Sequence, residues 1–393
     1  MIDIKNLADF SSIAEASYLD FDRAADKKLD YSNSVHLARI LDIKNKKDFD
    51  GKFSATQANS FVSEWTVIHH QKNTESGFSA TLFKNGSGEY VLGIRGTELS
   101  FNPFNNADLL STDLGDIVYD GLAIDQIIDL YNYWQQLTAA KGSVYIVKTL
   151  EYLSEETINL YRALSGEKTL SGVSAEEYLE WIYSRDDIII DNGPGGKSVR
   201  QIVETDSDTL YDDDRREGLG INGLVPGNVD VTGHSLGGHL ATAFSRLFPE
   251  LNASAYSING AGFATGNFAG LVGDAHLNID NLFSSLGGAG SFDSSKVINL
   301  FADKNPEFIS QNNKYGLEQQ GDHQSVFIES GLGHGAQGMT DSLAVYELFM
   351  SLDGSLLNGS PESALSKLLR LSEAVSRVED KLKNKYSMSV IRH

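Results

Sequence analysis

Three short runs rich in apolar and β-branched residues predict β-strands in the first quarter of the chain. These runs are 63–70, 78–83 and 89–95. The Asn85-Gly86 pair before the third run is a strong hairpin signal, because both residues tolerate the left-handed backbone of a tight turn. Apolar residues recur at three- to four-residue spacing over 1–50 and over much of 107–137, so both segments are expected to be largely helical.

The second half of the chain alternates predicted strands with predicted helices. The strands are expected at 228–232, 254–259, 296–302 and 324–329. The helices are expected at 239–248, which Pro249 ends, and at 338–352. Alternation of this kind implies a mostly parallel sheet with helices on both faces, so the predicted fold class is α/β.

Residues 141–222 interrupt this alternation. Two amphipathic stretches, 144–164 and 174–184, predict a helical insertion that could cap a site, followed by a flexible acidic loop. The expected organisation is one domain over 1–360 that contains this insertion. An amphipathic C-terminal helix is expected in 361–393.

The charge balance is strongly acidic. Asp and Glu number 54 against 32 Lys and Arg, which gives a formal charge of −22. This argues against a nucleic-acid partner, because phosphate binding needs clustered basic residues. The segment 361–393 is different, with seven basic and four acidic residues. It is interpreted as an ordinary docked helix, with contact to an anionic lipid surface or a partner as the alternative.

Cysteine is absent, which removes disulfides, thiolate metal sites and thiol nucleophiles. The run Asp212-Asp213-Asp214 is interpreted as a solvated loop, and a calcium site is the alternative because hard cations prefer clustered carboxylates. Its spacing does not match an EF-hand. We therefore expect no required cofactor, with Ca²⁺ as the one possible metal.

The amino-terminal segment lacks the basic start and apolar core of an ordinary secretory signal. No run approaches about 18 consecutive apolar residues, so no transmembrane helix is expected. The expected location is extracellular by a route that needs no signal peptide, with the cytoplasm as the alternative.

The most informative motif is Gly-His-Ser-Leu-Gly-Gly at 233–238, which places Ser235 between a predicted strand and a predicted helix. A nucleophile on such a sharp turn needs glycine two residues before and after it, so that strand and helix can pass closely. The amino terminus of the helix then favours negative charge near Ser235. We interpret Ser235 as a nucleophile.

A serine nucleophile needs a base, and the base needs an acid to orient it. In this fold class the order along the chain is serine, then acid, then histidine. His239 lies on the helix behind the turn and is expected to be a surface or packing residue. His276 precedes the strand that should carry the acid. His334 follows the last predicted strand in a glycine-rich loop and is the preferred base, with His323, which precedes that strand, as the alternative.

The acid is expected at the carboxyl end of the penultimate strand. Asp303 follows the run 296–302 directly and is the preferred residue. Asp293 lies before that strand and Asp322 lies beside His323, so both are weaker candidates.

The tetrahedral intermediate that forms when a serine attacks a carbonyl needs two hydrogen-bond donors. The backbone N–H of Leu236, directly after the nucleophile, is one. The loop after the third strand should supply the other, and Thr97 occupies that place with its backbone N–H and its hydroxyl.

Several segments together resemble the class 3 lipase family of α/β-hydrolases, and in particular bacterial extracellular lipases and phospholipases A1. They are IRGTE at 94–98, DLLSTDLGDI at 108–117, VTGHSLGGHLA at 231–241, SINGAGF at 257–263 and HGAQGMTDSLAVYELF at 334–349. The resemblance implies an α/β-hydrolase fold, with Ser235 as nucleophile, Asp303 as acid, His334 as base and Thr97 as an oxyanion residue.

The resemblance also implies hydrolysis of carboxylic esters of lipids at a membrane or droplet interface. Triacylglycerol and the sn-1 ester of a phospholipid are both candidate substrates. An antibacterial or host-directed phospholipase toxin would use the same chemistry and is the alternative. A non-catalytic binding module and a peptidase are the rival classes, and the apparent triad and the GHSLGG–RGT pairing argue against them.

Overall fold

The computed structural model describes most of the chain. The described residues are 4–19, 30, 32–41, 53–96, 122–154, 159, 174, 188–191, 198–264, 275–303, 317–328, 334–357 and part of 367–377.

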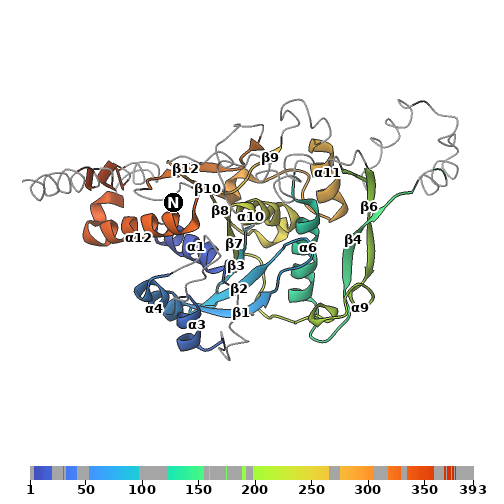
Figure 1. Ribbon diagram of the computed structural model, residues 1–393, viewed down its shortest axis with the longest axis horizontal. Helices are drawn as coiled ribbons and strands as arrows, with labels where there is room; N and C mark the ends of the chain where they lie inside the picture. Colours follow the sequence, from blue (N-terminus) through green and yellow to red (C-terminus); the bar gives the residue numbers. More distant parts are fainter. Residues whose placement is uncertain are drawn as a thin grey trace, which may run out of the picture.

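A seven-stranded sheet forms the centre of the fold (Figure 1). In spatial order its strands are β1 (Trp65–Gln71), β2 (Ala80–Asn85), β3 (Tyr90–Ile94), β7 (Val229–His234), β8 (Ala255–Ile258), β10 (Val297–Ala302) and β12 (Asp322–Val326). The first three strands are antiparallel, and from β3 to β12 every neighbouring pair is parallel. The predicted mostly parallel sheet is therefore confirmed, and each of the seven predicted strands overlaps an observed one.

Helices cover both faces of this sheet (Figure 1). On one face lie α6 (Ile124–Thr138), α10 (Leu236–Leu247) and α11 (Ala275–Ser285), and on the other lie α1 (Ile4–Ala16), α3 (Ser34–Leu41), α4 (Ala55–Glu64) and α12 (Ala336–Leu352). The strands serve two hydrophobic cores because successive side chains point to opposite faces. Leu82 and Leu92 enter the core beneath α6 and α10, whereas Phe83 and Val91 enter the core beneath α1.

Local sequence explains where several of these elements begin. Ser54 caps α4 through a capping box, accepting from the N–H of Gln57 while the Gln57 side chain accepts from the N–H of Ser54. All five residues of β3 are buried, as expected for a strand covered on both faces.

The remaining short elements are α9 (Ser207–Leu210), β9 (Phe263–Ala264), β11 (Leu317–Glu318), η3 (Asp214–Arg216), η4 (Pro249–Leu251), η5 (Ser294–Lys296) and η7 (Gly354–Leu357).

The predicted helical insertion is wrong where the structure describes its main elements. A second, antiparallel sheet of three strands occupies this part of the chain, in the order β4 (Ile146–Tyr152), β6 (Ser198–Asp206) and β5 (Ile188–Asp191). The segment Ile-Val-Lys-Thr of β4 is rich in β-branched residues, which suit a paired strand better than a helix. Most of the second predicted stretch, 174–184, lies outside the described residues, and the domain boundaries stay a prediction.

The added sheet packs beside α6, as Figure 1 shows. The Asn132 side chain donates to the carbonyl of Lys148 and accepts from its N–H, both at 2.8 Å. One amide on α6 thereby takes the place that a neighbouring strand would have along the free edge of β4. Arg200 of β6 adds an ion pair to Asp125 at 3.1 Å.

We predict that Gly93→Ala destabilises the fold, because the new Cβ would overlap Ser17 Oγ and lie 2.9 Å from Ile13 Cγ2. Overpacking of this kind costs about 1–3 kcal/mol, which denaturant unfolding can measure. Gly86→Ala is the matched control, since a Cβ added at that position would have no heavy atom within 4 Å. Equal unfolding free energies for the two variants would contradict this packing of the Ser17 segment on β3.

Candidate active site

Ser235 lies on the turn between β7 and α10 with φ 58° and ψ −122°. A residue with a Cβ rarely adopts a positive φ, and such a conformation costs about 1–3 kcal/mol and persists only where its surroundings impose it. Backbone hydrogen bonds hold Ser235 on both sides. Its N–H donates to Ile258 O at 3.0 Å, and its carbonyl accepts from the N–H of Ala261 at 3.2 Å.

Two glycines allow this turn to be so tight. A Cβ on Gly233 would overlap the carbonyl of Gly237, and a Cβ on Gly237 would overlap the carbonyl of Ile94 on β3. Each obstacle is backbone rather than a flexible side chain, so it could not move aside. A strained serine on a strand–turn–helix at the carboxyl edge of a mostly parallel sheet forms the sharp turn, or elbow, that is characteristic of α/β-hydrolases. The chain has the α/β-hydrolase fold.

His334 contacts Ser235 directly. Its Nε2 lies 2.9 Å from Ser235 Oγ, within the range required of a general base. The histidine stands just before α12, whose N-cap is Gly335. Ser235 is 2% exposed, so this contact is shielded from bulk water.

Asp303 lies directly after β10, at the same edge of the sheet. Its N–H donates to Val326 O at 2.9 Å, and its Oδ1 accepts from the N–H of Ile328 at 3.0 Å. Val326 is the last residue of β12, and Ile328 follows it, six residues before His334 in the sequence. The structure therefore fixes Asp303 against the chain that carries the histidine.

Of the two predicted oxyanion residues, the structure describes only Leu236. Leu236 is the first residue of α10 and is buried, so its N–H belongs to a helical turn whose donors have no intrahelical acceptor. Thr97 lies outside the described residues. Gly96, directly before it, packs so closely on the elbow that a Cβ there would overlap the carbonyl of His234.

The alternative candidates occupy other positions. His323 lies within β12, and its ring stacks on Phe301 with centroids 4.2 Å apart. Asp322 begins the same strand and is exposed. Asp293 caps η5 by accepting from the N–H of Ser295 at 3.0 Å. The backbone of His276 lies in α11.

The sequence did not predict that His234 connects Tyr18 to His334. His234 Nε2 lies 2.5 Å from the carbonyl of His334, and His234 Nδ1 lies 2.8 Å from the hydroxyl of Tyr18. Because a carbonyl only accepts, Nε2 carries a proton, and the Tyr18 hydroxyl donates to Nδ1 in the neutral ring. The histidine inside the motif gave a signal, but no pattern connects it to Tyr18, which lies just after α1.

His239 is a packing residue, as predicted. It is fully buried, and its ring stacks on Phe263 with centroids 4.0 Å apart. The Ala123 N–H donates to its Nε2 at 3.3 Å, and its Nδ1 donates to Gly262 O at 3.2 Å. Burial lowers the pKa of His239 to about 4, so the ring is neutral at pH 7.

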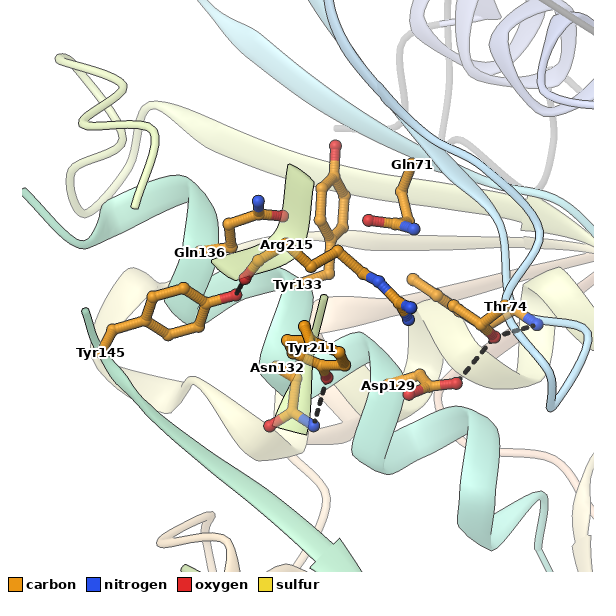
Figure 2. Close-up of a pocket in the computed structure, with 10 residues that line it drawn as sticks. Gln71, Thr74, Asp129, Asn132, Tyr133, Gln136, Tyr145, Tyr211 and Arg215 are labelled. Atoms are coloured by element: carbon orange, nitrogen blue, oxygen red, sulfur yellow. Dashed lines mark hydrogen bonds between the residues drawn. The ribbon is translucent and has the colours of Figure 1, made fainter. Parts of the chain in front are cut away.

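A separate polar pocket lies between α6, the turn after β1 and the η3 segment (Figure 2). Asp129 accepts hydrogen bonds from Thr74 Oγ1 at 2.7 Å and Ser76 Oγ at 2.6 Å, and burial raises its pKa. Arg215, which lines the pocket, forms an ion pair with Asp213 at 2.7 Å. The cavity volume of about 10 Å³ accommodates one water, so this pocket is too small for an ester substrate.

Asp213 also caps η3, so one member of the acidic run has a structural role. Across the described part of the chain, no group of three or more His, Asp or Glu side chains is arranged to hold a metal ion. None of the described helices combines the length and apolar character needed to cross a membrane.

Comparisons with known proteins give distant likenesses. No protein-family model and no curated protein matches the chain. Similar solved structures include a lipase from Rhizopus microsporus var. chinensis (TM-score 0.32, 11% identity, 84% of this chain and 76% of that chain). Lipase II from Rhizopus niveus (0.31, 11%, 84% and 82%) and Lip2 lipase from Yarrowia lipolytica (0.29, 12%, 84% and 82%) are also similar. Likeness this distant does not assign an activity, which has to be inferred from the site.

We predict that His239 contributes to acid sensitivity. Its pKa of about 4 in the folded state lies below the usual value near 6.5, so the unfolded chain binds more protons between these pH values. The free energy of unfolding should therefore fall as the pH falls from about 6.5 toward 4, by up to about 1 kcal/mol per pH unit from this residue. In His239→Gln, whose amide still donates and accepts but does not titrate, unfolding measured across this range should depend less on pH. Identical dependence in both proteins would contradict the assignment.

Proposed function

We propose that this protein hydrolyses carboxylic esters of lipids through an acyl-enzyme on Ser235. The observation that carries the proposal is the 2.9 Å contact between Ser235 Oγ and His334 Nε2 on a strained turn. A buried serine hydroxyl aimed at a neutral imidazole is the arrangement that activates an otherwise weak nucleophile.

The proposed first half-reaction gives these residues the roles that the sequence predicts. As Ser235 Oγ attacks the ester carbonyl, His334 Nε2 accepts its proton and the carbonyl oxygen becomes an oxyanion. The N–H groups of Leu236 and Thr97 donate to that oxyanion, while Asp303 orients His334 and stabilises the imidazolium. When the tetrahedral intermediate collapses, the C–O bond to the leaving alcohol breaks and His334 returns the proton to it.

Water completes the cycle. His334 takes a proton from the water molecule as it attacks the acyl carbonyl on Ser235. Collapse of the second tetrahedral intermediate releases the fatty acid, and the proton returns to Ser235 Oγ. The reaction needs no redox step and balances with one water consumed for each ester cleaved.

Lipid esters are the substrate class that the motifs favour. The pairing of GHSLGG at 233–238 with IRGTE at 94–98 resembles class 3 lipases, which supports triacylglycerol or the sn-1 ester of a phospholipid as substrate. Structurally, the two motifs meet where Gly96 packs against His234 at the elbow.

We predict that Ser235→Ala lowers hydrolysis of both triacylglycerol and phosphatidylcholine by roughly 10³-fold or more, because the acyl acceptor is lost. Fatty-acid release in a pH-stat measures this, and analysis of product position separates lipase from phospholipase A1. Ser245→Ala is the matched control, since its hydroxyl donates to Thr242 O on its own helix, away from the elbow. Retained turnover in Ser235→Ala would refute the mechanism.

A lipid substrate also predicts activation at interfaces. An acyl groove would be shielded in water by 141–200 or by the 99–115 loop with its Phe101 and Phe104, which lies outside the described residues. Specific activity on a short-chain ester should rise sharply where the ester aggregates. Equal specific activity on monomeric and aggregated ester would count against this gating.

A further inference from the structure

Asn259 lies directly after β8 in a left-handed conformation, with φ 47°, and it is fully buried. We propose that Asn259 is a positioning residue that sets the distance and orientation of Asp303 relative to Ser235. This inference rests on the proposed function, in which these two residues act in one reaction. Asn259 itself contacts neither the ester nor the reacting atoms.

The chain on either side of Asn259 holds the nucleophile. Ile258 accepts the Ser235 N–H at 3.0 Å, and the N–H of Ala261 donates to the Ser235 carbonyl at 3.2 Å. The segment 258–261 therefore fixes the backbone of Ser235 on both sides. Any shift of Asn259 along β8 would be transmitted to the elbow.

Asn259 also holds the strand that carries the acid. Its N–H donates to Leu300 O at 2.7 Å, and its side-chain Oδ1 accepts from the N–H of Ala302 at 2.8 Å. The regular pairing of β8 with β10 ends at Ile258 and Leu300. The amide thus continues the ladder beyond the end of β8, up to the residue directly before Asp303.

An asparagine suits this position for two physical reasons. Its left-handed conformation is tolerated because a short polar side chain can bond locally. A buried amide is costly unless it is bonded, and Oδ1 of Asn259 has the Ala302 N–H as a partner. Two hydrogen bonds, joined by the covalent backbone of Ile258 and Asn259, thus connect Ser235 to Ala302, the residue before Asp303.

The first test is Asn259→Gly. Glycine keeps the positive φ without strain, so the variant removes the amide and little else. We expect kcat to fall by roughly 10- to 100-fold with KM unchanged, because a small displacement of the acid misaligns the triad. Asn252→Gly is the matched control, since Asn252 is also left-handed, with φ 54°, but is exposed at the end of η4. The kcat of Asn252→Gly should equal that of the wild type.

The second variant, Asn259→Asp, keeps an oxygen that can accept from Ala302. It should retain at least about tenfold more kcat than Asn259→Gly, and equal losses would contradict the role of the amide oxygen. This variant also keeps the proposal testable if the glycine protein folds poorly, which thermal melting would report.

A double-mutant cycle separates positioning from general destabilisation. If Asn259 acts through Asp303, then Asn259→Gly should cause no further loss of kcat in an Asp303→Asn background. If the kcat losses of the two single variants multiply in the double variant, the positioning role is overturned, whereas the proposed function still stands. Wild-type turnover by Asp303→Asn alone would instead remove Asp303 from the mechanism, and the positioning role with it.

Discussion

The proposed active site depends on holding Ser235 in a backbone conformation that residues with a side chain rarely adopt. A strain of about 1–3 kcal/mol persists only where neighbouring elements leave no other choice. Here β3 and β8 flank the elbow, and the close approach of Gly233 and Gly237 leaves no room for relaxation. The strain aims a buried hydroxyl at His334, so rigidity of the sheet is a condition of the proposed chemistry.

The two hydrophobic cores provide that rigidity from opposite sides. One core packs α6 and α10 behind Ser235, and the other packs α1 and α12 against the same strands. The second core also brings Tyr18 to His234, and His234 in turn contacts the carbonyl of His334. Distant parts of the chain thus meet at His334, because Tyr18 follows the amino-terminal helix α1.

Much of this arrangement was accessible from the sequence, because strong local patterns encode it. The glycine spacing around Ser235 predicted the elbow, and chain order predicted which histidine faces it. The helical insertion was wrong because β4 reads as amphipathic in isolation and becomes a strand only by pairing with β6. Tyr18 and Asn259 were missed because their partners, His234 and Ala302, are far away in sequence. Thr97 lies outside the described residues, and the catalytic roles of Ser235, His334, Asp303 and Leu236 remain predictions.

The proposed chemistry requires that Ser235 acts as the nucleophile. Labelling with a fluorophosphonate tests it most directly, because an activated serine displaces fluoride from phosphorus and stays covalently modified. Mass spectrometry of the labelled protein should show one adduct per chain, located on Ser235, and none in Ser235→Ala. An adduct on another serine, or ester hydrolysis by protein that takes no label, would contradict the account.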